Sequence, residues 1–221
     1  MTDSGTGRRG SYAKGVAKRE EILTRALDVI AREGYRGASV KELADAVGLS
    51  QAGLLHYFDS KEELFTEILR KRDEIDSIDQ GLGGDFQEGL ARTQSGEAID
   101  VRTGYLGVIR HNADVPGLVH LFARLSVDAA DPGHPAHQFF LTRGENLRGF
   151  FASAIAAQQA AGQLDDRIDP ETLARLFQAV ADGMQVQWML EPDVDMAATV
   201  GALFDLLTPA APAPDDGTTR S

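Results

Sequence analysis

The chain has 221 residues, of which 43% are hydrophobic and 25% are charged, a globular composition that argues against disorder along the whole chain. It contains no cysteine, which excludes disulfides, cysteine-ligated zinc and a cysteine nucleophile. The net charge of −12 is uneven, because residues 1–61 hold 10 basic and 8 acidic side chains, whereas residues 62–221 hold 12 and 26. This asymmetry indicates that the two parts of the chain have different roles.

Both ends of the chain are polar. Residues 1–13 are rich in Gly, Ser, Thr and Arg, and residues 209–221 in Pro, Ala, Asp and Thr, so we expect disordered tails there. No apolar run approaches the roughly 20 residues that cross a bilayer, and the N-terminus lacks the apolar stretch of a signal peptide. We therefore expect a cytoplasmic protein without membrane contact.

Between the tails the apolar residues recur at helical spacing, which predicts an all-α fold. Three N-terminal helices are predicted, at residues 15–33, 40–47 and 51–57. The capping box Ser39-Val-Lys-Glu42 begins the second, Gly48 ends it, and Ser50 can cap the third. A second capping box, Ser60-Lys-Glu-Glu63, opens a longer fourth helix. A helix, a glycine-containing turn and a short helix are typical of the helix-turn-helix motif.

The short third helix of such a motif lies in the DNA major groove. Its face away from the core carries Gln51, which can bond adenine, and Ala52 and Leu55, which can approach a thymine methyl. DNA phosphates can be bonded by the hydroxyl, imidazole and ammonium groups of neighbouring residues and by the amides at the capped helix starts. The predicted DNA-contacting residues are Ser39, Lys41, Ser50, Gln51, Ala52, Leu55, His56, Tyr57 and Lys61. The alternative is that Leu55 is core and that His56 and Tyr57 pack locally.

Residues 18–69, and above all LSQAGLLHYFDSKEELF at 49–65, resemble the N-terminal domain of the TetR family of transcriptional repressors. The resemblance implies a homodimer with nine or ten helices per subunit. It also implies two recognition helices on a palindromic operator, and a C-terminal domain with the dimer interface and a small-molecule pocket. By position, the nine residues above match the family's DNA-contacting sites. Leu55 stands where the family often has Tyr, so a phosphate-bonding hydroxyl is missing there.

The remaining chain predicts five further helices, at residues 96–112, 115–129, 135–161, 170–190 and 194–207. Residues 80–95 are predicted as a loop with room for a short turn. With the resemblance, these elements suggest a DNA-binding domain at residues 14–61 and a ligand-binding and dimerisation domain at residues 62–208.

The predicted helix at 170–190 has two apolar stripes, which together are too wide for a helix buried on one side. We assign the stripe with bulky side chains to the subunit interior and the stripe with small residues to a dimer partner, together with apolar residues of the last helix. The predicted interface comprises Leu176, Ala179, Gly183, Val186, Leu190, Val200, Leu203 and Leu207. The alternative is that both stripes pack within one subunit.

A ligand pocket is expected to be apolar and aromatic with a few placed polar groups. The predicted pocket residues are Tyr105, Ile109, Phe122, Ser126, Phe140, Arg143, Met184 and Trp188. Ordinary core packing is the alternative for each aromatic residue. An inward-facing Arg143 would select an anionic ligand, unless it is paired with an acid or lies on the surface.

No hydrolase, phosphate-loop or metalloprotease motif is present, and His134 and His137 are weak evidence for a metal. We expect no enzyme activity, cofactor or metal. The leading hypothesis is a ligand-responsive regulator, most simply a repressor that binds a palindromic operator as a dimer and that a small molecule releases. The alternative is a helical small-molecule-binding protein or enzyme in which the helix-turn-helix is only scaffold.

Overall fold

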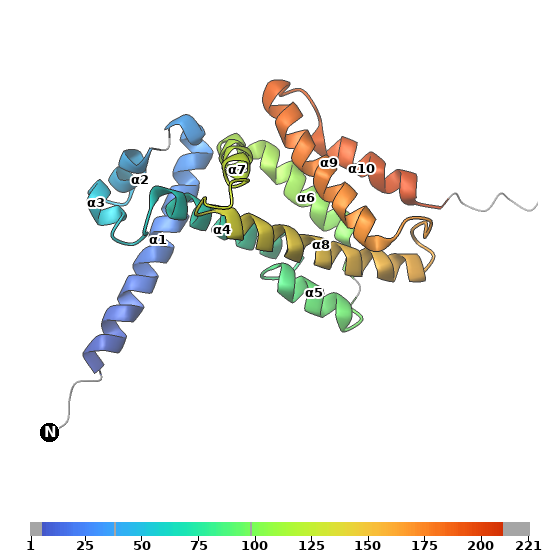
Figure 1. Ribbon diagram of the computed structural model, residues 1–221, viewed down its shortest axis with the longest axis horizontal. Helices are drawn as coiled ribbons and strands as arrows, with labels where there is room; N and C mark the ends of the chain where they lie inside the picture. Colours follow the sequence, from blue (N-terminus) through green and yellow to red (C-terminus); the bar gives the residue numbers. More distant parts are fainter. Residues whose placement is uncertain (1–5, 38, 98, 210–221) are drawn as a thin grey trace, which may run out of the picture.

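The computed structural model describes residues 6–37, 39–97 and 99–209, which form α-helices joined by turns and contain no strand. This confirms the predicted all-α class. The helices are α1 (Thr6–Gly37), α2 (Val40–Ala46), α3 (Gln51–Leu54), α4 (Lys61–Asp79), α5 (Phe86–Gln94), α6 (Val101–Asp114), α7 (Pro116–Asp128), α8 (His137–Ala160), α9 (Pro170–Leu190) and α10 (Met196–Leu207). Figure 1 shows α2 and α3 at one end of the molecule and α9 and α10 at the other.

The first helix is longer than the sequence pattern predicts. It begins at Thr6, so residues 6–13 continue a helix that we expected to start near Gly15, and a non-helical Gly34 interrupts it near its end. This corrects the predicted tail at residues 1–13 from Thr6 onward, while residues 1–5 lie outside the described part. Of the predicted tail at 209–221, residues 210–221 also lie outside the described residues.

The second helix and the turn after it follow the prediction. Ser39 and Glu42 form the capping box at the start of α2, with the Ser39 amide donating to the Glu42 carboxylate at 2.7 Å. Gly48 has a left-handed φ of 69°, which lets the chain reverse toward α3. The Ser50 hydroxyl accepts a hydrogen bond from the Gly53 amide at 3.0 Å and so caps α3.

The recognition helix itself is shorter than predicted. It ends at Leu54 rather than near Tyr57, with Leu55 as its C-cap. The Tyr57 amide then donates to the Leu54 carbonyl in a turn, and this turn brings Phe58 into the core, where it is 2% exposed. His56 and Tyr57 therefore lie on a turn after the helix.

Residues 80–95, which we predicted as a loop, contain α5. Its N-cap is Asp85, whose carboxylate accepts a hydrogen bond from the Glu88 amide at 2.8 Å. The following helix begins at Val101 rather than near Gly96, because Asp100 caps it through the Thr103 amide. Both starts follow the ordinary preference of Asp for the N-cap position.

The buried apolar residues form two clusters. The first joins α1, α2, α3 and the first half of α4 to α7 and the start of α8. The second joins α5, α6, α9 and α10 to the rest of α8. The boundary that we predicted after residue 61 therefore does not separate two cores, since α7 packs with the N-terminal helices.

The contact between α1 and α7 depends on Gly117. A Cβ atom at this position would lie 2.1 Å from the Ile30 carbonyl oxygen and 2.8 Å from Gly34 Cα. Both atoms belong to the backbone and cannot move aside as a side chain can. The absence of a side chain at Gly117 therefore sets how closely the two helices approach.

We expect Gly117→Ala to lower the free energy of unfolding by about 1–3 kcal/mol, because overpacking must push the helices apart. Urea denaturation at constant m-value measures this change. Gly15→Ala is the matched control, since no atom lies within 4 Å of the Cβ it would add. Equal stabilities of the two variants would contradict the close-contact explanation.

Candidate functional site

The nine predicted DNA-contacting residues gather on and around α3. Gln51, Ala52 and Leu55 are exposed, although Leu55 only moderately, at 37%. His56 is exposed and Tyr57 half-buried. The core face of the same segment is formed by Leu54 and Phe58. The segment thus presents a mixed amide, methyl and imidazole surface outward.

Two exposed lysines flank this surface. Lys41 lies in the first turn of α2, and Lys61 is the first residue of α4. The hydroxyls of Ser39 and Ser50 already accept hydrogen bonds from amides in their own helices. Each hydroxyl still has its O–H to donate, so an anion at these helix starts can bond that hydroxyl, the remaining N-terminal amides and the lysine ammonium groups.

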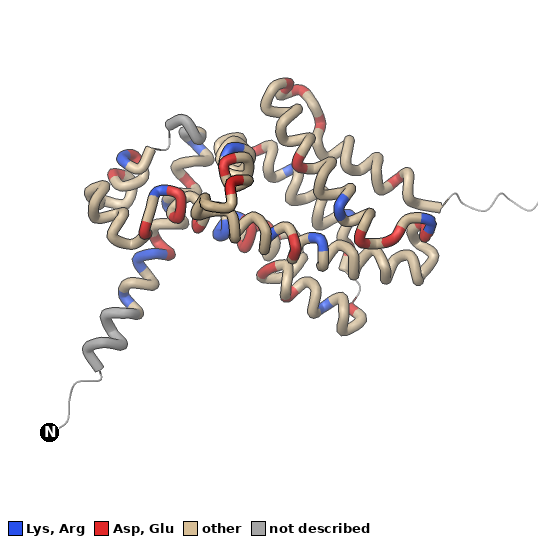
Figure 2. Tube along the Cα trace, viewed as in Figure 1, with Lys and Arg blue, Asp and Glu red and all other residues tan. Residues whose placement is uncertain are grey.

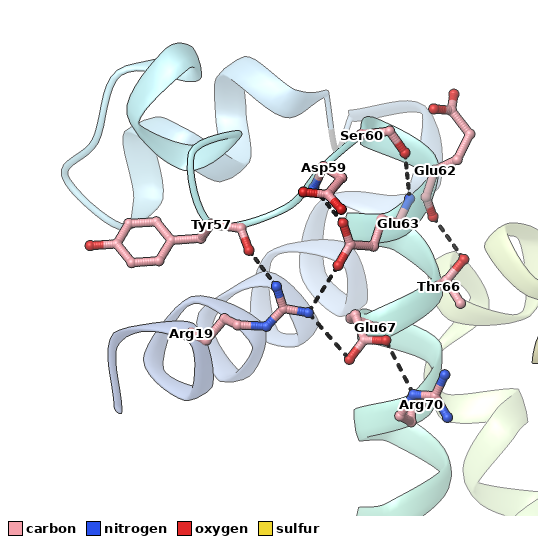
Figure 3. A network of polar contacts seen from close by, with 9 residues as sticks. All are labelled: Arg19, Tyr57, Asp59, Ser60, Glu62, Glu63, Thr66, Glu67 and Arg70. Atoms are coloured by element: carbon pink, nitrogen blue, oxygen red, sulfur yellow. Dashed lines mark hydrogen bonds and ion pairs between the residues drawn. The ribbon is translucent and has the colours of Figure 1, made fainter. Parts of the chain in front are cut away.

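Arg19 on α1 ties the turn after α3 to α4, as Figure 3 shows. Its guanidinium donates to the Tyr57 carbonyl and to the Glu63 carboxylate, the latter at 3.1 Å, and lies 3.6 Å from the Glu67 carboxylate. The same group stacks on the Phe58 ring, 4.4 Å from its centroid. Arg19 therefore holds the turn after α3 against α1 and α4.

At the opposite end of the molecule, α9 presents an apolar face to solvent. All five residues of the predicted small-residue stripe are exposed: Leu176, Ala179, Gly183, Val186 and Leu190. Figure 2 shows that α9 and α10 carry few charged positions. On α10, Val200 and Leu207 are buried inside the subunit and Leu203 packs against its core. This corrects the assignment of Val200 and Leu207 to the interface, whereas the half-buried Leu203 stays a prediction. The exposed face of α10 carries Leu206, which is 78% exposed.

Between these ends lies a small cavity of about 50 Å³ beneath an open cleft of about 370 Å³. Asp73, Ser77, Phe86 and Arg143 line both spaces. The remaining cavity wall combines apolar side chains with a few polar ones, which are Asp76, Leu82, Tyr105, Val108, Ile109, Asn112, Leu147, Phe151, Ala181, Asp182 and Gln185.

An ion-pair cluster separates the cleft from the cavity. Arg143 of α8 donates from Nε to Asp73 Oδ2 at 2.6 Å and from Nη2 to Oδ1 at 3.3 Å. Arg72 donates to the same Oδ1 at 2.7 Å. Burial alone would raise the pKa of the Asp73 carboxyl, but the two guanidinium groups hold that pKa below its usual range. Asp73 is thus held as an anion by two guanidinium groups.

The other two aspartates of the cavity, Asp76 and Asp182, have carboxyl pKa values that are shifted in the opposite direction. Burial raises the pKa of the Asp76 carboxyl, although Arg72 and His111 act against it, and His111 Nδ1 lies 2.8 Å from Asp76 Oδ1. Burial also raises the pKa of the Asp182 carboxyl. Among the described residues, Asp182 forms no ion pair.

The structure brings together only part of the predicted pocket. Tyr105, Ile109 and Arg143 line the cavity, and Phe122 stacks on Arg143 at 4.8 Å. The other four do not line it, because they pack elsewhere: Phe140 against the first core, Met184 and Trp188 against the second, and Ser126 with its hydroxyl bonded to the Ala123 carbonyl. Because Arg143 is paired with Asp73, it does not offer the unpartnered charge that would select an anion.

The comparisons with known proteins agree with this geometry. Residues 22–68 match the family described as bacterial regulatory proteins, tetR family. The chain is 27% identical over 191 residues to the HTH-type transcriptional regulator TcmR of Streptomyces glaucescens, which covers 81% of this chain and 76% of TcmR. The N-terminal helix-turn-helix domain of the chain is that of the TetR family. The chain is a DNA-binding transcriptional regulator.

Two further relatives show where the likeness is concentrated. The HTH-type transcriptional repressor KstR2 of Rhodococcus jostii is 43% identical over 53 residues, which is 24% of this chain and 26% of KstR2. A crystal structure of a TetR-family regulator from Agrobacterium tumefaciens has a TM-score of 0.62 at 20% identity and covers 88% of this chain and 100% of that one. The fold is shared along the chain. Among the described residues, no helix is both long and apolar enough to cross a membrane.

We expect Arg19→Met to lower the free energy of unfolding by about 1–2 kcal/mol, because it removes the guanidinium hydrogen bonds and the stacking on Phe58. It should also weaken DNA binding without changing the salt dependence, since Arg19 positions the turn and does not bind a phosphate. Urea denaturation and DNA titrations at several salt concentrations measure both effects. Arg32→Met on the same helix is the control, because within the described residues Arg32 bonds the Asp28 carbonyl one turn away and no other element. A smaller salt slope in the Arg19 variant would instead make Arg19 a direct DNA contact.

Proposed function

We propose that this regulator is a TetR-family repressor that binds a palindromic operator as a homodimer and is released by a small molecule bound in the cavity between α4, α5, α6, α8 and α9. The observation that carries the proposal is the position of α4. Its first half lies in the core that supports α3, and its second half supplies Asp73, Asp76 and Ser77 to the cavity wall. A ligand in the cavity therefore touches the helix that supports the DNA-binding surface. Such a role places the protein in the cytoplasm of a bacterial cell.

The exposed side of α3 supports a role in base recognition. Gln51 is at the start of the helix, exposed, and can form two hydrogen bonds with an adenine edge. Ala52 and Leu55 give it apolar neighbours suited to a thymine methyl. We assign contacts with the DNA phosphate backbone to Ser39, Ser50, His56 and Tyr57. Lys41 and Lys61 lie on either side as phosphate contacts. Two such surfaces must sit about 34–36 Å apart to reach successive major grooves.

We expect Gln51→Ala to lose about 1–3 kcal/mol of discrimination at one base pair of the operator while keeping most non-specific affinity. Lys61→Ala is the matched comparison, because loss of a phosphate contact weakens all sequences alike and reduces the salt slope by about one. Fluorescence anisotropy with DNA flanking the protein's own gene, and with scrambled DNA, measures both. An unchanged preference at every position in the Gln51 variant would contradict base recognition by this residue.

The exposed face of α9 supports a dimer interface. Ala179 and Gly183 allow close approach of a second helix, and Leu176, Val186 and Leu190 supply apolar area around them. Leu206 extends the face onto α10. A contiguous apolar surface of this kind is typical of a surface that another chain covers.

We expect Gly183→Arg to give folded monomers, because the position is exposed and no atom lies within 4 Å of an added Cβ, while an arginine would hold the partner helix away. Sedimentation velocity and circular dichroism measure mass and folding. Ala91→Arg on the exposed surface of α5 carries the same charge and should leave the dimer intact. A dimeric Gly183→Arg variant would move the interface elsewhere.

A further inference from the structure

Three polar side chains in the cavity wall have an oxygen atom without a hydrogen-bond partner. These atoms are Ser77 Oγ, Asn112 Oδ1 and Gln185 Oε1. Ser77 and Asn112 are only 2% and 7% exposed, so bulk water does not satisfy them. Buried polar atoms are nearly always paired, so unpaired ones indicate a partner that binds there. The two amide oxygens can only accept hydrogen bonds, whereas the Ser77 hydroxyl can accept or donate, so the wall as a whole favours a ligand that donates them.

The charges around the cavity also favour a donor. Three aspartates face two arginines there, and both arginines donate to the same aspartate, Asp73. Asp76 has His111 as its nearest partner at 2.8 Å. Asp182 has a hydrogen bond with the Gln178 side chain and is attracted by both arginines, but in the described structure neither arginine comes close enough to form an ion pair with it. A bound cation would supply the missing countercharge.

We propose that the effector is an organic ammonium or amidinium compound whose charged group binds in the inner cavity beside Asp182, with its N–H groups donating to the oxygens of Gln185, Asn112 and Ser77. This inference rests on the proposed function, because it specifies the chemical class of the molecule that acts at the same cavity. An anion is disfavoured, since it would have to displace Asp73 from Arg143 and then lie next to Asp182.

The sizes of the two adjoining spaces limit the shape of this compound. The inner cavity of about 50 Å³ accommodates a small charged group but no drug-sized body, whereas the cleft of about 370 Å³ lies in the usual range for ligand pockets. Phe86 lines both spaces and Phe139 lines the cleft, which gives the outer part aromatic walls. The apolar body of the compound therefore occupies the cleft, and the pair Arg143–Asp73 must shift to admit its cationic end.

Three probes with the same ring test the charge preference: 2-naphthylmethylamine, 2-naphthylmethanol and 2-naphthoate. Isothermal titration calorimetry of the full chain should show the amine binding at least about tenfold more tightly than the alcohol, and the carboxylate most weakly. Asp182→Asn should bring the amine to within about twofold of the alcohol and leave the alcohol unchanged. Asp193→Asn, an exposed carboxylate after α9, is the matched control and should keep the full preference.

Two further measurements separate recognition from a structural role. Asp182→Asn should raise the melting temperature of the ligand-free protein, because it removes the excess buried charge, whereas a structural Asp182 would make the variant melt lower. Gln185→Leu keeps that carboxylate and removes one acceptor, so it should weaken the amine about threefold to tenfold.

The proposal is overturned if the carboxylate binds most tightly, if Asp182→Asn keeps the tenfold preference, if Gln185→Leu leaves amine affinity unchanged, or if the wild-type protein binds none of the three probes at millimolar concentration. Operator binding is measured on the same protein without probe. Specific DNA binding together with failure of the probes rejects the cationic effector alone. Loss of specific DNA binding rejects the proposed function itself.

Discussion

The second half of α4 carries charged side chains into the interior, and this constrains the whole subunit. A buried charge is tolerated only where its partners are close and well aligned. Asp73 obtains them from Arg72 and from Arg143 on α8, and Asp76 from His111 on α6. The first half of the same helix lies in the apolar core beneath α3. One helix is therefore held by ion pairs at one end and by apolar packing at the other, and it connects the cavity with the DNA-binding surface.

The sequence pattern predicts the helices well where a cap and an apolar stripe coincide. The boxes at Ser39 and Ser60 and the Asp169-Pro170 start correspond to helix starts in the structure. The prediction was wrong for α5, because its short apolar stripe follows a glycine-rich stretch, although Asp85 followed by Glu88 is a recognisable capping signal. It overestimated α3, since helical spacing does not show that the chain must turn to bury Phe58.

The cavity was harder to predict than the DNA-binding surface. The recognition segment is local, so its outward residues follow from a short stretch of helical spacing. The cavity is built from five helices that are spread along the sequence. The aspartates on α4 look like a solvated face until α6 and α8 are placed against them. On α9, helical spacing alone does not show that Gln185 lines the cavity whereas Gln187 is exposed. On α10 the apolar pattern was correct, but Val200 faces inward and Leu206 outward.

The close packing of α1 on α7 at Gly117 has a consequence for protein engineering. A chimaera that exchanges only the first 61 residues between two relatives would separate surfaces that are fitted to each other, because α7 and the start of α8 belong to the N-terminal core. The transplantable unit is discontinuous: it consists of the N-terminal helices together with a later segment of the chain. Hybrid sensors with new operator specificity therefore require that both pieces be moved together, or that the glycine contact be redesigned.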